Sequence, residues 1–236
     1  MQAEFVISSG TLRGGGGECT ISNVSNSYTI SIEKRKLNEF KTFVRNNKAI
    51  HIIRKVTDDK TMDSIVSSRN IFGIPSNYIG NSTKNNNDLV LLSSKGVGYI
   101  NSNELDCKKL ELSKKYNVII TYAMSGGNKP SSSGTYQVIS SLKITEPGTI
   151  FSETYLCIGS FDNYTEAYSL SSYISTKFAR FLLLQALSSI HITKDCFTYV
   201  PVQKWDHQYT DCELYSKYGL SNDEISTIEN TIKELS

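Results

Sequence analysis

Short apolar runs, several of them alternating with polar residues, recur along this chain and predict β-strands. The runs are separated by clusters of Gly, Ser, Asn and Pro, which are typical of turns and loops. We expect strands at residues 4–7, 28–32, 89–93, 97–100, 117–123, 138–144, 149–159 and 197–202.

Two other stretches space their apolar side chains every three or four residues, which predicts amphipathic helices. The first spans residues 38–56 and is a helix or a pair of short helices with basic residues on its other face. The second begins after Asn163 and runs to about Leu187, with a kink expected near Ser175. The aromatic side chains of this second helix are interpreted as core residues rather than as a platform for stacking bases.

The carboxy-terminal part of the chain contains two helix start signals. Thr210 with Glu213, and Ser221 with Glu224, have the spacing of capping boxes, in which each side chain bonds the other residue's backbone. Gly219 is placed to end the first of these helices. The chain therefore ends in a helix, a glycine stop and a second helix.

Composition predicts a folded chain. Of its 236 residues, 39% are hydrophobic and 20% are charged, which is ordinary for a globular protein. The longest apolar run is too short to cross a bilayer, and the first ten residues do not resemble a secretory signal. The five cysteines are an odd number without CxxC spacing, so we expect a soluble protein of the reducing cytoplasm.

The net charge of +2 does not by itself indicate nucleic-acid binding. The distribution of charge is more informative, because basic residues gather in three places while acidic residues concentrate near the carboxy terminus. Solvated surface is the other interpretation of these clusters. The basic clusters are residues 34–36, residues 45–55 and residues 108–115.

Catalytic motifs are difficult to find. The three histidines, His51, His191 and His207, do not have metal-ligand spacing, and structural roles are expected for them. The glycine run at residues 14–17 lacks the Gly-Lys-Ser/Thr of a phosphate loop, and neither an adenine-methylation tetrapeptide nor a glycine fingerprint for S-adenosylmethionine occurs. We therefore expect no catalytic centre, and no catalytic or metal-binding residue is assigned.

Several segments, taken in order, carry a family resemblance. They are FKTFVRNNKAIHIIRKV, SIVSSRNIFGIPSNY, KGVGYI, ITEPGTIFSETYLCIGSFDNYTEA, YISTKFARFLLLQAL and FTYVPVQKWDHQYTDCELYSKYGLSNDEISTIE. Together they resemble the carboxy-terminal target-recognition region of Eco57I-like adenine-specific DNA methyltransferases from bacterial restriction-modification systems. The resemblance covers nearly everything after about Cys19.

The resemblance implies an α/β (α+β) fold with a twisted mixed sheet, flanking helices and DNA-facing loops. In that family an amino-terminal domain methylates adenine N6 with S-adenosylmethionine, and the downstream region reads the DNA sequence. This chain is therefore expected to be a single recognition domain over residues 1–236, without enzymatic activity or a cofactor of its own. Residues 1–18 match poorly, and residues 205–236 form a helical end segment. The implied partners are double-stranded DNA and the catalytic domain, and no membrane is implied.

The polar loops supply the candidate DNA-binding residues. Arg69 lies in a loop of hydroxyl and amide groups, where its guanidinium can clamp a phosphate or read guanine. The alternative is that Arg69 pairs with an internal carboxylate and shapes the loop. The full candidate set is Ser67, Ser68, Arg69, Asn70, Lys95, Tyr99, Ser125, Asn128 and Lys129, with Thr193 and Lys194 as a weaker pair.

Two other functional classes stay open. Asp58, Asp59 and Lys60 have the composition of a metal-binding site in a small metal-dependent nuclease. The carboxy-terminal helices offer a surface for a protein-interaction module. Cleavage of plasmid DNA in the presence of Mg²⁺ distinguishes the nuclease from a recognition domain, which leaves DNA intact.

Overall fold

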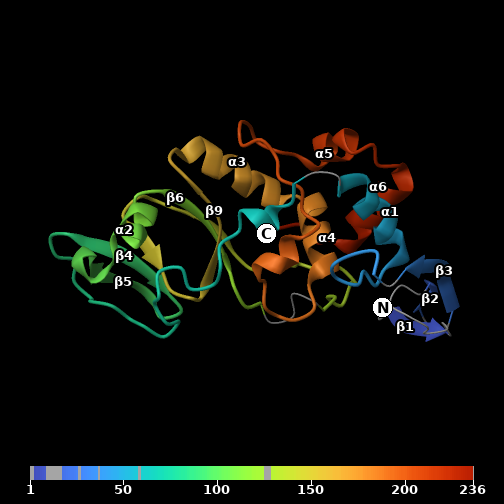
Figure 1. Cartoon of the computed structure of the whole chain (residues 1–236), viewed down its shortest axis with the longest axis horizontal. Helices are drawn as coiled ribbons and strands as arrows, with labels where there is room; N and C mark the ends of the chain where they lie inside the picture. The colour runs from blue at the N-terminus through green and yellow to red at the C-terminus, as the bar shows by residue number, and fades with distance from the viewer. Residues whose placement is uncertain are drawn as a thin grey trace.

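The computed structural model describes residues 3–8, 18–25, 28–36, 38–57, 60–124 and 129–235. Its described part is an α+β fold in which nine strands form three separate three-stranded sheets. The amino-terminal sheet lies at one end of the molecule, and a small lobe lies at the other (Figure 1). The helices of the last third of the chain lie between these ends.

The described elements follow one another in this order. The strands are β1 (Ala3–Ser8), β2 (Glu18–Ser25), β3 (Tyr28–Lys36), β4 (Asp88–Ser93), β5 (Gly96–Asn101), β6 (Tyr116–Thr121), β7 (Leu142–Thr145), β8 (Thr149–Phe151) and β9 (Tyr155–Phe161). The α-helices are α1 (Asn47–Val56), α2 (Cys107–Ser113), α3 (Tyr164–Ser175), α4 (Lys177–Ala186), α5 (Asp211–Lys217) and α6 (Asn222–Thr231). Three short 3-10 helices are η1 (Met62–Ser64), η2 (Ser102–Glu104) and η3 (Lys194–Phe197).

Each of the three sheets has its own strand order and direction. The amino-terminal sheet is an antiparallel β1-β2-β3 meander. In the small lobe, β4 is central, antiparallel to β5 and parallel to β8. In the third sheet, β6 is central and antiparallel to both β7 and β9. We use "small lobe" for β4, β5, β8, α2 and the loop at residues 70–87.

The strand pair β6–β9 is buried on both faces and separates two hydrophobic cores. Successive side chains of a strand point to opposite faces, so one residue of each pair enters one core and its neighbour enters the other. The larger core lies under the helices and the smaller core lies in the small lobe. The side chains in the larger core are Val118, Ile120, Leu156 and Ile158, and those in the smaller core are Ile119 and Cys157.

A buried arginine joins three segments of the larger core. Arg180 on α4 is 1% exposed, and its Nε donates to the carbonyl oxygens of Ser175 and Thr176. Its Nη1 donates to the carbonyl oxygens of Gln137 and Lys233. Burial lowers the pKa of Arg180. The segment that follows α6 is therefore fixed, through the Lys233 carbonyl, to α4 and to the segment before β7.

The second predicted helix is confirmed, together with its interruption. The chain leaves helical geometry at Thr176, whose side chain then caps α4 by accepting from the Ala179 N–H. Asn163 caps α3, and the capping box of Ser221 and Glu224 is complete at α6. At α5 the Thr210 side chain caps the Glu213 N–H, while the Glu213 carboxylate bonds His207 instead.

Several expected elements are corrected by the structure. The single strand at 149–159 is two strands, β8 and β9, which turn at Ser152 and enter different sheets. The stretch 197–202 is not a strand, because η3 and a turn precede one isolated bridge from Pro201 to Thr61.

Three further boundaries differ from those expected. The helix at 38–56 begins only at Asn47, since residues 38–42 form bends and Asn46 provides the cap. The strand at 138–144 shortens to β7, and Val138 itself has a positive φ of 71°. Strand β2 and helix α2 were not expected. No described helix is long and apolar enough to cross a membrane.

We expect Arg180→Ala to lower the free energy of unfolding by about 3–4 kcal/mol. Each buried carbonyl oxygen that loses its donor costs about 1–3 kcal/mol, and a cavity is left in the core. Urea denaturation measures the change. The control is Arg54→Ala, which removes a half-exposed ion pair with Glu39 and is expected to cost less than about 1 kcal/mol. Equal losses in the two variants would contradict the anchoring role of Arg180.

Candidate nucleic-acid interface

Arg69 lies at the seam between the small lobe and the larger core. Its guanidinium carbon is 4.2 Å from the centroid of the Tyr122 ring, which directly follows β6. The imidazole of His191 stacks on the same Tyr122 ring, with centroids 4.9 Å apart and an interplanar angle of 23°. Three segments that are distant in sequence therefore meet at the Tyr122 ring.

Glu153 completes this cluster from the turn between β8 and β9. Its Oε2 is 3.1 Å from Nη2 of Arg69, and its Oε1 accepts from the Ser76 N–H at 3.4 Å. The Glu153 N–H in turn donates to the carbonyl oxygen of Ile74. One carboxylate thus connects Arg69 to the loop that begins the small lobe.

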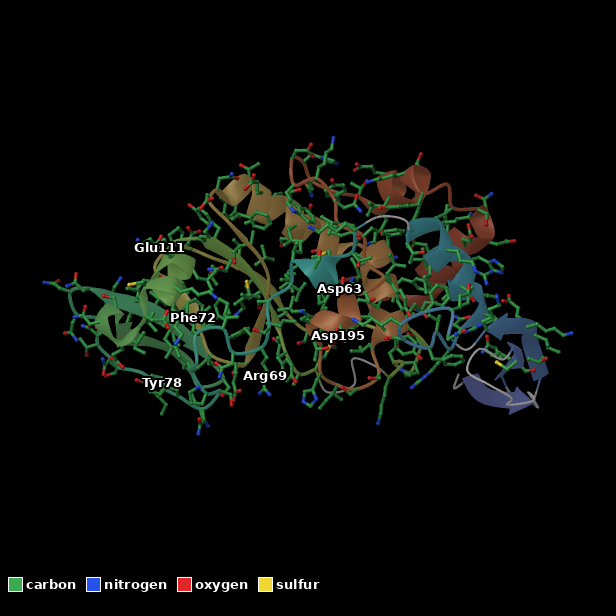
Figure 2. The ribbon with its side chains drawn as sticks, in the orientation of Figure 1. Asp63, Arg69, Phe72, Tyr78, Glu111 and Asp195 are labelled. Carbon is green, nitrogen blue, oxygen red and sulfur yellow. The ribbon has the colours of Figure 1, made fainter. Side chains whose placement is uncertain are left out.

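The geometry favours the shaping role that the sequence left open for Arg69. An ion pair and a ring contact already occupy parts of the guanidinium, which holds the loop at the seam. The side chain nevertheless stays 47% exposed at the lower edge of the molecule as drawn in Figure 2. Arg69 can therefore position the loop and still present N–H donors to a ligand.

The neighbours of Arg69 have different environments. Ser67 is bonded twice to the carbonyl oxygen of Cys157, through its N–H and its hydroxyl, so it ties the loop to β9. Ser68 is exposed. Asn70 has a positive φ of 60°, which Asn tolerates better than most residues, and its carbonyl accepts from Gly73 to close a turn. Of the four, only Ser68 and Arg69 are exposed.

Lys95 and Tyr99 both belong to the β4–β5 hairpin of the small lobe. Lys95 is exposed in the two-residue turn between the strands. Tyr99 is partly buried on β5, and its backbone exchanges two hydrogen bonds with Asn81. Lys95 is thus available to a ligand, whereas the main contribution of Tyr99 is to hold the loop.

The exposed residues between positions 76 and 97 include no carboxylate. Between residues 64 and 103 the sequence contains one acidic residue, Asp88, which is buried and accepts from the Asn85 N–H and the Asn101 side chain. The exposed residues between 76 and 97 carry amides, hydroxyls and two lysines, and we call them the acid-free face. They include Asn77, Tyr78, Ile79, Asn81, Ser82, Thr83, Lys84, Asn85, Asn86, Asn87, Ser94, Lys95 and Val97.

Exposed acidic residues follow β5: Glu104 lies on η2, whose Ser102 N–H donates to the Asn87 carbonyl, and two others lie at α2. Figure 2 shows Tyr78 at the lower edge of the lobe and Glu111, on α2, at the upper edge. Asp106 caps α2 and pairs with Lys109, and Glu111 pairs with Lys114. The lobe therefore separates a surface of mixed charge around α2 from the acid-free face.

Lys129 lies far from the acid-free face in sequence and lines a different feature. A concavity of about 1530 Å³ is bounded by the amino-terminal sheet, the start of α1, the end of α4, and α6. Its basic lining residues are Arg45, Lys48 and Lys129, its acidic ones are Asp223 and Glu224, and its apolar ones include Leu184 and Tyr136. The concavity is thus mixed in charge, unlike the acid-free face.

The remaining candidates are dispersed or lie outside the described residues. Thr193 precedes η3 and Lys194 is exposed within it, away from the small lobe in the fold. Ser125 and Asn128 lie outside the described residues, as do Asp58 and Asp59 of the nuclease alternative. Across the described ranges, no group of three or more His, Cys, Asp or Glu residues is arranged to hold a metal ion.

The carboxy-terminal helices are part of the core. Leu214 on α5 and Ile228 on α6 are buried in the larger core, and Lys55 on α1 pairs with Glu224 at 2.6 Å. Lys177 on α4 donates to Glu229 on α6, and this contact raises the pKa of Lys177. The apolar faces of α5 and α6 are therefore already used within the chain.

Sequence reasoning missed Tyr122 and Glu153, because their partnership depends on how β6, β8 and β9 assemble. It also missed the extent of the acid-free face. A signal for that face was present in the sequence, since residues 64–103 contain only one acidic residue. Comparison with family models, curated proteins and solved structures finds no match to this chain.

We expect Arg69 and Tyr122 to be energetically coupled. A double-mutant cycle with Arg69→Met and Tyr122→Leu should give a coupling of about 0.5–1 kcal/mol in urea denaturation, as expected for a cation over an aromatic ring. Arg54→Met paired with Tyr122→Leu is the control and should be additive within about 0.5 kcal/mol. Additivity of Arg69→Met with Tyr122→Leu would mean that the stack does not hold the seam.

Proposed function

We propose that this chain is a sequence-specific DNA-recognition module that serves an adenine-N6 DNA methyltransferase of a restriction-modification system. The observation that supports DNA binding is the acid-free face of the small lobe. Its exposed side chains between residues 76 and 97 include two lysines and eight asparagine, serine or threonine residues but no carboxylate. The methyltransferase assignment rests on the resemblance of the ordered segments described above.

A surface without carboxylates suits duplex DNA for electrostatic reasons. An exposed carboxylate near a phosphate is repelled, whereas lysine and arginine release counterions when they neutralise phosphates. Asparagine amides can both donate and accept, which suits them to base edges such as those of adenine. The acid-free face therefore combines groups for backbone contact with groups for base readout.

Two other regions add cations to this proposal. Arg69 is half exposed at the seam, and Lys129 lies with Arg45 and Lys48 at the concavity. In this proposal, these residues bind the phosphate backbone and position the duplex, and the small lobe contacts the base edges. A separate catalytic domain extrudes adenine and supplies S-adenosylmethionine, and both act in the cytoplasm.

Charge reversal on the acid-free face should weaken DNA binding. Lys84→Glu with Lys95→Glu is expected to lower affinity for duplex DNA at least tenfold and to reduce the salt slope by about 2, if each lysine neutralises one phosphate. Fluorescence anisotropy over a salt series measures both quantities.

The matched control makes the same charge change on α2 and at its carboxy-terminal cap, in the same lobe. Lys108→Glu with Lys114→Glu should leave affinity within about threefold, because these residues lie with the mixed-charge surface. If both double variants lose affinity equally, net charge rather than the acid-free face governs binding. If the unaltered protein fails to bind duplexes at low salt, the proposed function is wrong.

Single cation deletions test the two flanking regions. Arg69→Ala and Lys129→Ala are each expected to weaken duplex binding several-fold and to reduce the salt slope by about 1. Unchanged binding in one variant would remove that residue from the interface. Because Arg69→Ala also breaks the ion pair with Glu153, Glu153→Gln is the control for an effect on folding alone.

A further inference from the structure

Three large apolar side chains are exposed between residues 76 and 97. Ile79 is 64% exposed, Val97 is 67% exposed and Tyr78 is 38% exposed. Exposed apolar side chains on an otherwise polar surface indicate a contact site when they gather in one place. Tyr78 and Ile79 are adjacent in sequence, whereas Val97 belongs to β5.

The backbone holds Tyr78 and Ile79 against the β4–β5 hairpin. The segment 76–81 runs along β5 and is fastened to the hairpin at both ends. At one end the Ser76 carbonyl accepts from the N–H and the hydroxyl of Ser94. At the other end Asn81 exchanges two backbone hydrogen bonds with Tyr99, at 2.7 and 2.9 Å. Tyr78 and Ile79 therefore lie against the face of β5 toward which position 98 points, while the side chain of Val97 leaves the opposite face of the strand.

Close approach at Gly98 fixes the middle of this segment. A Cβ atom at position 98 would lie 2.0 Å from the carbonyl oxygen of Ile79, so only glycine permits the observed contact. Gly80 has a positive φ of 72°, and a Cβ there would lie 2.7 Å from the Tyr99 carbonyl. Tyr78 and Ile79 are thus displayed on a backbone that is held at both ends and in the middle.

The surroundings identify the kind of partner. Lys84 and Lys95 are exposed in the segments that follow Ile79 and precede β5, and the other exposed polar residues between 76 and 97 are amides and hydroxyls. A rigid apolar patch bordered by cations fits a polyanion that can also offer apolar surface. Nucleic acid offers such surface on the faces of its bases where a step is unstacked, and apolar wedges are known to exploit it.

We propose that Tyr78 and Ile79 form a wedge that packs against base faces at a partly unstacked step of duplex DNA. This inference rests on the proposed function and adds a mode of binding to it. Through the wedge the small lobe distorts the duplex, so part of its discrimination comes from how readily a sequence unstacks. The cations on either side hold the backbone while the step opens.

The experiment compares two DNA probes of about 25 base pairs that differ only in one central bulged nucleotide. A bulge supplies an unstacked step in advance, so a wedge binds it more tightly than the fully paired duplex. We expect the unaltered protein to favour the bulged duplex roughly tenfold in anisotropy titrations at one fixed salt concentration. The Tyr78→Ser, Ile79→Ser double variant should lose this preference and keep its salt slope.

Two controls separate the wedge from its alternatives. Tyr164→Ser with Tyr168→Ser removes exposed aromatic rings from α3, outside the acid-free face, and should leave the preference for the bulge intact. Gly98→Ala keeps the apolar side chains but displaces the segment that carries them, and it should reduce the preference in protein whose circular dichroism spectrum is unchanged.

The outcomes distinguish the wedge from the function on which it rests. If the unaltered protein binds both duplexes with equal affinity, or if the Tyr78, Ile79 variant keeps the preference, the wedge is wrong and the DNA-recognition proposal stands. If neither duplex binds, both proposals fail. In that case, the apolar residues would be exposed in the free chain because a protein partner covers them in the complex.

Discussion

The organisation of this molecule depends on the double-sided burial of the β6–β9 strand pair. Because successive side chains alternate between faces, Ile119 and Cys157 enter the small-lobe core while their neighbours enter the larger one. The pair is thus a shared wall, and neither core is complete without it. The β6–β9 pair also positions Tyr122, which follows β6, and Glu153, which precedes β9. Because both residues contact Arg69, the strand pair determines where Arg69 lies.

Polar groups buried in the larger half of the molecule specify how its segments dock. Arg180 gathers carbonyl oxygens from three segments, and Arg35 on β3 donates to the Asn47 side chain and the Val44 carbonyl. Asn47 in turn donates to the Ile21 carbonyl on β2, which joins the amino-terminal sheet to α1. Such groups are costly to bury unless they are bonded, so they favour one arrangement of the segments over others.

Local signals in the sequence predicted the helices well and the sheets less well. The caps at Asn163, Ser221 and Thr210 and the stop at Gly219 depend on neighbouring residues alone, and each ends or begins its helix as expected, although the box at Thr210 is only half formed. Strand partners depend on contacts between distant residues. The apolar run at 149–159 therefore looked continuous, although a turn divides it between two sheets.

The candidate site shows the same division between local and distant information. The exposure of Lys95 in a hairpin turn follows from the turn residues around it. The pairing of Arg69 with Glu153 follows from the assembly of β8 and β9, which the sequence pattern did not reveal. The α+β class was predictable from the resemblance and is confirmed, while the distribution of strands over three sheets was not.

The fastening of the 76–81 segment has a consequence for how this surface could be altered. On the segment's own side, the contacts at Ser76, Ile79 and Asn81 are made by backbone atoms. Residues 77–79 can therefore exchange their side chains while the path of the chain stays the same. Such a surface is suited to laboratory reprogramming, since libraries restricted to these few positions would vary chemistry on a constant frame, with Gly98 left untouched.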